Sequence, residues 1–149
     1  MKIKIAKAMK QISRYKGEIN LIEDRIKKSI SVPEVNEYPE DFVSLTTLRN
    51  EKVRELITLK CKVMQKNIES GMFVIITTVS ELKNEIVLYK DFEIKQGIVK
   101  NRYDENAGLM HKTQITVAEC EKHISELQTG INDYTDELDA FNAITEIEI

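Results

Sequence analysis

The chain has 149 residues and a net charge of −3, with 42% hydrophobic and 32% charged side chains and only five glycines and two prolines. This composition excludes collagen-like, mucin-like and disulfide-scaffold proteins, and so few turn-forming residues argue against a many-stranded sandwich or barrel. We therefore expect a single domain over 1–149. Its fold should be mainly α: an antiparallel bundle of long, coiled-coil-like helices with a small β-hairpin insertion, assembled as an oligomer.

A seven-residue apolar repeat predicts the first helix, over about 4–29. Isoleucine recurs every seventh residue from Ile5 to Ile26, which is the seam spacing of a coiled coil. Both prolines fall in the segment that follows, so that segment is expected to be a linker.

The second expected helix, over about 40–69, carries two apolar stripes. One stripe contains Phe42, Leu45, Leu56, Leu59 and Val63, and the other contains Val53, Ile57, Cys61, Met64 and Ile68. Because two stripes on one helix imply partners on two sides, this pattern favours a bundle or an oligomer over a lone helical hairpin.

Two segments have the residue types of strands. The run 72–77 is rich in β-branched residues and follows Gly71, a combination typical of a strand. The segment 112–116 is its expected partner, which would give a two-stranded ribbon. Such a ribbon is marginal alone and needs packing against helices or another subunit.

Sequences of the capping-box form S/T-x-x-E begin at Thr78 and at Thr116, and they predict the starts of two further helices. The third helix is expected over about 79–98. The fourth, over about 117–143, has apolar residues in alternating steps of three and four. The apolar alternation in 144–149 is expected either to fray or to dock on a partner.

Charge is distributed unequally between the two ends of the chain. Residues 1–28 carry nine basic and three acidic side chains, whereas residues 117–149 carry nine acidic side chains and one basic. We expect the two arms to pair with each other, within or between subunits. Binding of nucleic acid by the basic first helix is the alternative, and the acidic last helix argues against it.

No apolar stretch reaches the roughly 18 residues that would cross a membrane. The basic start is not followed by the apolar core of a signal peptide, so we expect a cytoplasmic protein with no membrane partner. Cys61 and Cys120 both fall within helical patterns, where buried free thiols are expected rather than a disulfide or a redox pair.

The order of these features is recognisable from short pieces along nearly the whole chain. They are Ala6 to Ala8, Arg25-Ile26, Pro39 to Asp41, Asn67, Thr78 to Leu82, Arg102-Tyr103, Thr116-Val117 and Asn142. In these pieces the chain resembles the septicolysin-like family of small, mostly uncharacterised helical proteins of bacteria and phages. The resemblance implies a helical protomer with a β-hairpin insertion that forms dimers and a hexamer built as a trimer of dimers. The segments 72–77 and 104–110 depart from the more polar or charged pattern of that family.

Signals of catalysis are close to nil, so we expect no enzyme activity, no catalytic residue, no metal and no cofactor. The glycines stand singly, without a phosphate-binding loop, and neither His111 nor His123 lies at ligand spacing from a cysteine or a second histidine. Glu119 and His123, four residues apart, read as a solvated pair, since two ligands are too few for a metal site. Cys120 lies on the apolar seam and is expected to be a core thiol rather than a nucleophile.

The most suggestive cluster surrounds a turn after the third helix. Its candidate ligand-binding residues are Lys100, Arg102, Tyr103, His111 and Lys112. Arginine offers a planar fork for phosphate, lysine a point charge and tyrosine a face on which a base can stack. The amides at the start of the fourth helix could also face an anion. The competing interpretation is a solvated loop that only holds subunits together.

These patterns predict a non-enzymatic, self-assembling helical protein that forms a homo-oligomer, either a dimer or a trimer of dimers. A sharper hypothesis is a binding protein that sequesters a small anionic or nucleotide-like ligand at subunit interfaces, in the manner of a phage anti-defence sponge. The alternatives are a purely structural or adaptor oligomer and a nucleic-acid-binding protein that uses its basic first helix.

Overall fold

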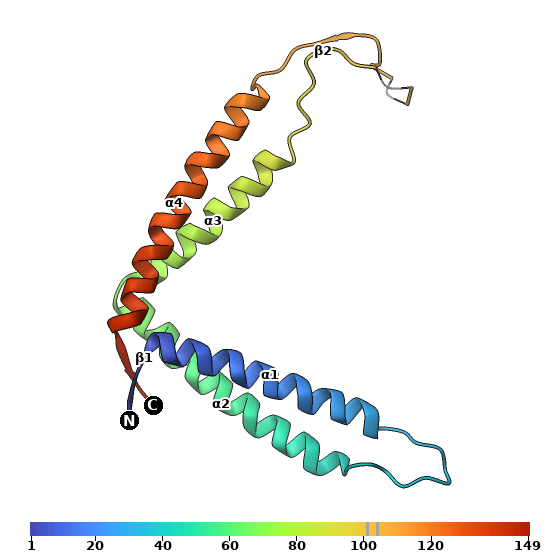
Figure 1. Cartoon of the computed structure of the whole chain (residues 1–149), viewed down its shortest axis with the longest axis vertical. Coiled ribbons are helices and arrows are strands. Elements are labelled where there is room, and N and C mark those ends of the chain that lie inside the picture. The colour runs from blue at the N-terminus through green and yellow to red at the C-terminus, as the bar shows by residue number, and fades with distance from the viewer. Residues whose placement is uncertain (101, 104) are drawn as a thin grey trace. The chain divides into compact units, whose positions relative to one another are not determined.

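The structure is a computed structural model, and it describes residues 1–100, 102–103 and 105–149. The elements, in chain order, are β1 (Lys2–Lys4), α1 (Ile5–Ser29), α2 (Phe42–Glu69), α3 (Met72–Lys90), β2 (Gly97–Ile98), β3 (Met110–His111), α4 (Val117–Ile144) and β4 (Glu146–Glu148) (Figure 1). The mainly α fold with a small antiparallel hairpin is therefore confirmed.

The chain divides into two compact units. Unit 1 comprises Met1–Phe73 together with Asp139–Ile149, and unit 2 comprises Val74–Leu138. Whether the two units fold as the expected single domain stays a prediction.

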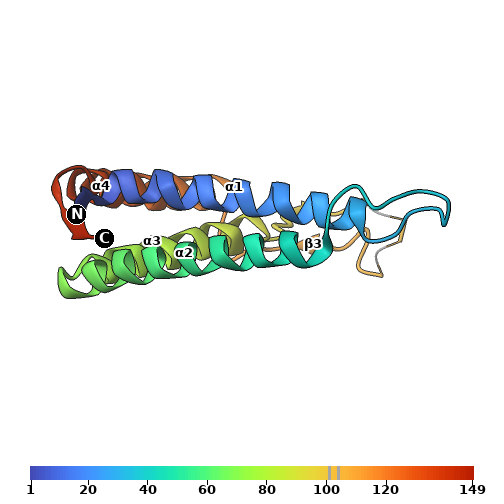
Figure 2. The same cartoon turned by 90° about the horizontal axis from the view of Figure 1, so that it is seen from below.

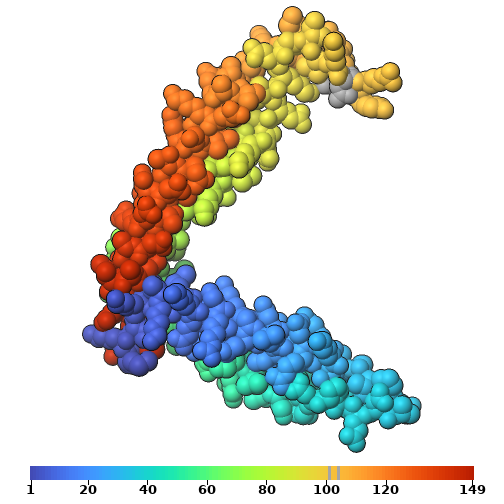
Figure 3. Space-filling model, viewed as in Figure 1, coloured from blue at the N-terminus to red at the C-terminus, as the bar shows by residue number. Residues whose placement is uncertain are grey.

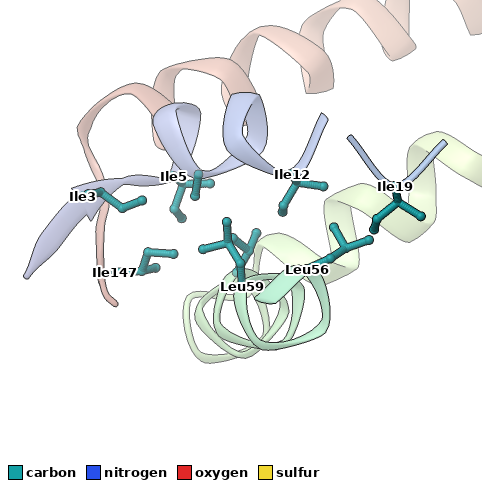
Figure 4. Close-up of a cluster of buried hydrophobic side chains, with 9 residues drawn as sticks. Ile3, Ile5, Ile12, Ile19, Leu56, Leu59 and Ile147 are labelled. Carbon is teal, nitrogen blue, oxygen red and sulfur yellow. The ribbon is translucent and has the colours of Figure 1, made fainter. Parts of the chain in front are cut away.

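Unit 1 is built on an antiparallel pair of helices, α1 and α2, which lie side by side in two perpendicular views (Figures 1 and 2). The seven-residue repeat of α1 faces α2, and Ile5, Ile12 and Ile19 are buried as predicted. The buried core of the unit consists of Ile3, Ile5, Ala8, Ile12, Ile19, Leu56, Leu59, Val63 and Ile147. Figure 4 shows these side chains meeting between the helices and the two terminal strands.

Ion pairs between α1 and α2 flank this core. The Arg49 guanidinium donates to Oε1 of Glu23 at 2.9 Å, and Nζ of Lys52 lies 3.7 Å from Oε2 of Glu18. Both pairs are partly exposed, so they orient the two helices more than they stabilise them.

The start of α2 is fixed by its N-cap. The Asp41 carboxylate accepts a hydrogen bond from the backbone N–H of Ser44 at 2.8 Å and another from its hydroxyl, which satisfies a backbone donor of the first turn. The helix therefore begins at Phe42 rather than at 40. Glu40 lies outside it and pairs with Arg25 at the end of the loop between α1 and α2.

The two ends of the chain pair as strands β1 and β4. Ile3 lies opposite Ile147 on the buried face, Lys2 lies opposite Glu148, and both isoleucines are at most 6% exposed. Lys4 and Glu146 form the next opposed pair. Basic and acidic ends thus meet within one chain, and residues 146–148 are neither frayed nor dependent on a partner for docking.

Unit 2 contains a second pair of helices, formed by α3 and α4. Its buried cluster is small, with Val79 and Ile86 of α3 packed against Ile131 of α4. The seam predicted for the fourth helix is confirmed at Ile131 and Cys120, both of which are buried, whereas Val117 at one end of it is 55% exposed.

The prediction of a strand over 72–77 is wrong, because these residues form the first turns of α3. The third helix accordingly spans Met72–Lys90 instead of 79–98. Thr78 does not cap it: its hydroxyl donates to the carbonyl of Val74 at 2.8 Å, inside the helix. β-branched residues lower helix propensity only slightly, so a helical context overrides them.

The predicted hairpin exists, but at other residues. Gly97 pairs with His111 and Ile98 with Met110, so the segment 112–116 is not a strand. Gly97 has φ +79°, a left-handed conformation that a helix interior cannot contain. The helix therefore does not include residues 97–98, and it already ends at Lys90.

Replacing Val74 with alanine tests the helical assignment by the sign of its effect. Val74 is 67% exposed within α3, so little packing is lost. We expect the free energy of unfolding to rise by about 0.5 kcal/mol, because alanine has the higher helix propensity. In a strand the same substitution would lower it. Urea unfolding at one fixed protein concentration measures the difference.

Candidate functional site

The five residues predicted to bind a ligand all lie on the β2–β3 hairpin or directly after it. Lys100, Arg102 and Tyr103 are exposed in the turn, and Tyr103 is 96% exposed. His111 is half-buried in β3, where its Nδ1 lies 2.9 Å from the carbonyl oxygen of Leu109. Lys112 is exposed immediately after β3.

The fold thus gathers three cations of this set on one short hairpin, but it does not enclose them. None of the four hollows described for the chain is lined by any of the five residues. Within one protomer the hairpin offers an exposed basic tip. A ligand pocket there would need a second surface, and a site between subunits stays a prediction.

The start of α4, the other group expected to face an anion, is occupied by its own capping box. The Thr116 N–H donates to Oε2 of Glu119 at 2.8 Å, and the Glu119 N–H donates back to the Thr116 hydroxyl at 3.2 Å. The bond from the Thr116 N–H, and after it the bond that the Thr116 hydroxyl donates to the same carboxylate oxygen at 3.1 Å, hold the pKa of Glu119 below its ordinary value of 4.5. Two of the amides at the start of α4, those of Thr116 and Glu119, are therefore engaged within the chain itself.

Replacing Glu119 with glutamine should lower the melting temperature at pH 7, and the loss should depend on pH. A carboxyl whose pKa is lowered by folding stabilises the protein above its unfolded pKa, and this contribution is lost as the pH falls through the folded pKa. The difference between wild type and Glu119→Gln should therefore shrink below pH 4.5 and then vanish. Thermal scans across pH measure it, with Glu121→Gln on the same helix as the control. A difference that stays constant with pH would contradict this account.

A second cluster links α3 and α4 in unit 2. Nε2 of His123 lies 2.9 Å from Oε1 of Glu85. The centroid of the His123 ring lies 4.3 Å from that of Tyr89, with the two ring planes tilted by 36°. The expected solvated pair of Glu119 and His123 is therefore replaced by a contact between helices. The Cys120 thiol is buried, as predicted, and donates to the carbonyl of Tyr89 at 3.5 Å.

A hollow of about 400 Å³ adjoins this cluster, lined by Tyr89, Gln114, Ile115, Glu119, Lys122, His123 and Glu126. Its ionisable groups have both signs, and none of them occupies the position of a nucleophile activated by a base. The contacts of His123 with Glu85 and Tyr89 show that His123 and Tyr89 pack between α3 and α4.

A larger hollow, of about 680 Å³, lies in unit 1 where α2 meets strands β1 and β4. Its lining consists of Lys2, Lys62, Gln65, Lys66, Glu69, Glu146, Ile147, Glu148 and Ile149. Three lysines face three glutamates, so the hollow has no net preference for an anion. The sequence could not indicate it, because the pairing of β1 with β4 was not predicted.

The second apolar stripe of α2 remains on the surface of unit 1 except at Val53, which is half-buried and packs against the core. Ile57, Met64 and Ile68 are 54%, 52% and 58% exposed, and Cys61 between them is also exposed. The first stripe, by contrast, is buried against α1 at Leu56, Leu59 and Val63. The expectation that Cys61 is a buried thiol is therefore wrong, because its side chain is exposed among the described residues.

Among the described residues, no group of three or more histidine, cysteine, aspartate or glutamate side chains could hold a metal ion. Over the same part of the chain, no helix is both long and apolar enough to cross a membrane. Comparison with family models, with curated protein sequences and with solved structures finds no match.

Proposed function

We propose that this chain is a non-enzymatic, self-assembling helical protein whose exposed apolar surfaces are covered by further copies of itself. The observation that carries the proposal is the small core of unit 2. Among the described residues of unit 2, only Val79, Ile86, Cys120 and Ile131 are buried apolar side chains. A pair of helices with so few buried groups gains little from folding alone.

Exposed apolar side chains support the same proposal in both units. In unit 2, Val87 and Leu88 of α3 are more than half exposed, and in unit 1 so are Leu21 of α1 and Ile57 of α2. In the space-filling view each helical pair forms a narrow band (Figure 3). Exposed apolar side chains in such numbers are typical of surfaces that associate.

Sedimentation velocity of the full chain at micromolar concentration tests this function. We expect a homo-oligomer, with a dimer or a trimer of dimers as the specific states, the latter being the assembly that the septicolysin-like resemblance implies. A protein that sediments as a monomer at tens of micromolar would overturn the proposal.

Sequestration of a small anionic or nucleotide-like ligand is the second part of the proposal. The β2–β3 hairpin supports it, because Lys100, Arg102 and Lys112 lie together there without an enclosing pocket in the protomer. A thermal-shift screen with a panel of nucleotides tests it. A shift with one nucleotide that is lost in Arg102→Ala and Lys112→Ala supports ligand binding, and no shift with any nucleotide leaves a structural or adaptor oligomer.

Nucleic-acid binding through α1 is the weaker alternative. Several of its cations are engaged within the chain: Arg14 bonds Glu18 at 2.9 Å, and Arg25 pairs with Glu40. If this alternative held, binding to DNA or RNA would fall steeply with salt and would be lost on neutralising Lys7 and Lys10.

A further inference from the structure

We propose that the hollow beside α2 is a groove for an extended peptide in which basic and acidic residues alternate, and that this peptide adds as a third strand to the outer edge of β4. The inference goes beyond self-assembly and does not depend on it, because every residue that it uses lies in unit 1 of a single chain.

The outer edge of β4 has backbone groups available for a further strand. The Met1 ammonium donates to the backbone oxygen of Ile149 at 3.0 Å, and the Ile149 N–H donates back at 2.8 Å, in an antiparallel register. Because such exchanges involve every second residue pair, Ile147 also bonds inward, whereas the N–H and C=O groups of Glu146 and Glu148 point away from β1. No described residue bonds these outward groups.

The hollow lies between this strand and α2. β4 is closer to α2 than β1 is, and the C-terminus lies on the α2 side of the N-terminus in both views (Figures 1 and 2). All three residues of β4 line the hollow, together with Lys62 and Lys66 of α2. An added strand runs about 4.8 Å from the strand that it pairs with, so its place is the space between β4 and α2.

The two walls of the hollow carry opposite charges that are not paired with each other. Glu146 and Glu148 lie on the β4 wall, and Lys62 and Lys66 lie on the α2 wall. Among the described residues, none of these four side chains forms an ion pair. Charges of both signs without partners, on facing walls, favour a ligand that also carries both signs.

The spacing of these charges matches the repeat of an extended chain. Glu146 and Glu148 are two residues apart in a strand, or about 6.8 Å, and Lys62 and Lys66 are four residues apart in a helix, or about 6 Å. Side chains on one face of an extended peptide recur at the same interval of about 6.8 Å. Basic residues on one face can thus meet both glutamates, while acidic residues on the other face meet both lysines.

The inner edge of β4 shows what its glutamates accept. Lysines of β1 stand opposite both of them, and opposite charges stabilise such cross-strand pairs whereas like charges destabilise them. The residue of β1 between its lysines is Ile3, whose side chain enters the apolar core. The corresponding residue of an added strand meets the lysines of α2 instead, so an acidic side chain suits this place better than isoleucine.

Fluorescence anisotropy with labelled peptides tests the proposal on the full chain at low ionic strength. We expect Lys-Glu-Lys-Glu-Lys-Glu to bind, and Lys-Lys-Lys-Glu-Glu-Glu, which has the same composition and net charge, to bind about 10-fold more weakly or worse. Equal binding of these two peptides would overturn the proposal, because affinity would then follow charge without strand order. Tighter binding of Lys-Ile-Lys-Ile-Lys-Ile would also overturn it and would assign the edge to β1 of a second copy.

Proline at position 148 tests the role of the strand edge. Glu148→Pro removes an N–H that points away from β1, so the pairing of β1 with β4 is kept. We expect the dissociation constant of the alternating peptide to rise about 10-fold. Glu148→Gln, which keeps the N–H, separates the loss of charge from the loss of this bond, and circular dichroism verifies that both variants keep their helices.

Lys62→Gln tests the wall formed by α2. We expect it to weaken binding of the alternating peptide about 3-fold and to leave binding of Lys-Gln-Lys-Gln-Lys-Gln unchanged, because that peptide has no acid to lose a partner. Lys60→Gln is the matched control, since Lys60 is exposed on the same helix and does not line the hollow.

The outcomes separate this inference from the proposed function. If Glu148→Pro binds the alternating peptide as wild type does, or if Lys62→Gln and Lys60→Gln behave alike, the groove is not the site and the inference fails. A chain that sediments as a monomer and still binds the alternating peptide in preference to the blocked one overturns self-assembly and supports the groove.

Discussion

Replacing Ile5 with alanine is expected to lower the free energy of unfolding by about 2–5 kcal/mol, the range for truncating a buried isoleucine. Ile5 is 0% exposed. It is the first residue of α1, and it lies beside Thr145, the residue that connects α4 to β4. Its side chain lies in the cluster with Ile3, Leu59 and Ile147, while its backbone N–H donates to the carbonyl of Thr145 at 2.9 Å. Truncation leaves a cavity at the junction of three elements, which limits how far the surroundings can relax.

Urea unfolding of Ile5→Ala and wild type at one protein concentration measures this loss, since assembly makes stability depend on concentration. Leu21→Ala, on the same helix but 67% exposed, is the control, and its effect should stay within about 0.5 kcal/mol. Equal effects of the two substitutions would mean that the core of unit 1 is not centred on Ile5.

Three of the four helices could be predicted from sequence because each has a strong local signal. The seven-residue repeat located α1 to within one residue at its start, and the capping box at Thr116 located the start of α4 at Val117. These patterns depend only on which side chains face a neighbouring helix. They hold whichever partner provides that neighbour.

The third helix shows where local signals conflict. The run 72–77 has the composition of a strand, yet its residues continue a helix that begins after Gly71, whose φ is +77°. A glycine followed by a run of β-branched residues is also the pattern expected at the start of a β-strand. Only the packing of the later residues, such as Val79 and Ile86 against Ile131, decides for a helix, and single-sequence propensity does not contain that contact.

The β1–β4 pair could not be predicted, because its register joins residues at opposite ends of the chain. The charge asymmetry indicated that the arms attract each other, but attraction alone sets no partner or register. The register follows from Ile3 meeting Ile147 on the buried face, which brings Lys2 opposite Glu148. The hollow beside α2 could not be predicted for the same reason, because β1 and β4 form part of its lining.

Replacing Ile147 with aspartate should lower the free energy of unfolding of the protein by about 3–5 kcal/mol, because a charge without a partner is placed in an apolar core. Ile147 is 6% exposed and belongs to the core cluster of unit 1. Ile144→Asp is the matched control: it changes the same residue type three positions earlier, at a side chain that is 76% exposed. Thermal and urea unfolding of the two variants give the comparison.

Hydrogen exchange distinguishes detachment of β4 from a loss of the whole unit. If the strand alone is released, the amides of Ile5 and Ile149 should lose protection, because they donate to Thr145 and Met1 respectively, while α2 amides stay protected near Leu56. If the pairing of the two charged arms were merely electrostatic, Ile147→Asp and Ile144→Asp would behave alike, since each adds one negative charge to the same end. A large difference between them would show that apolar burial fixes the register and that the opposed lysines and glutamates follow it.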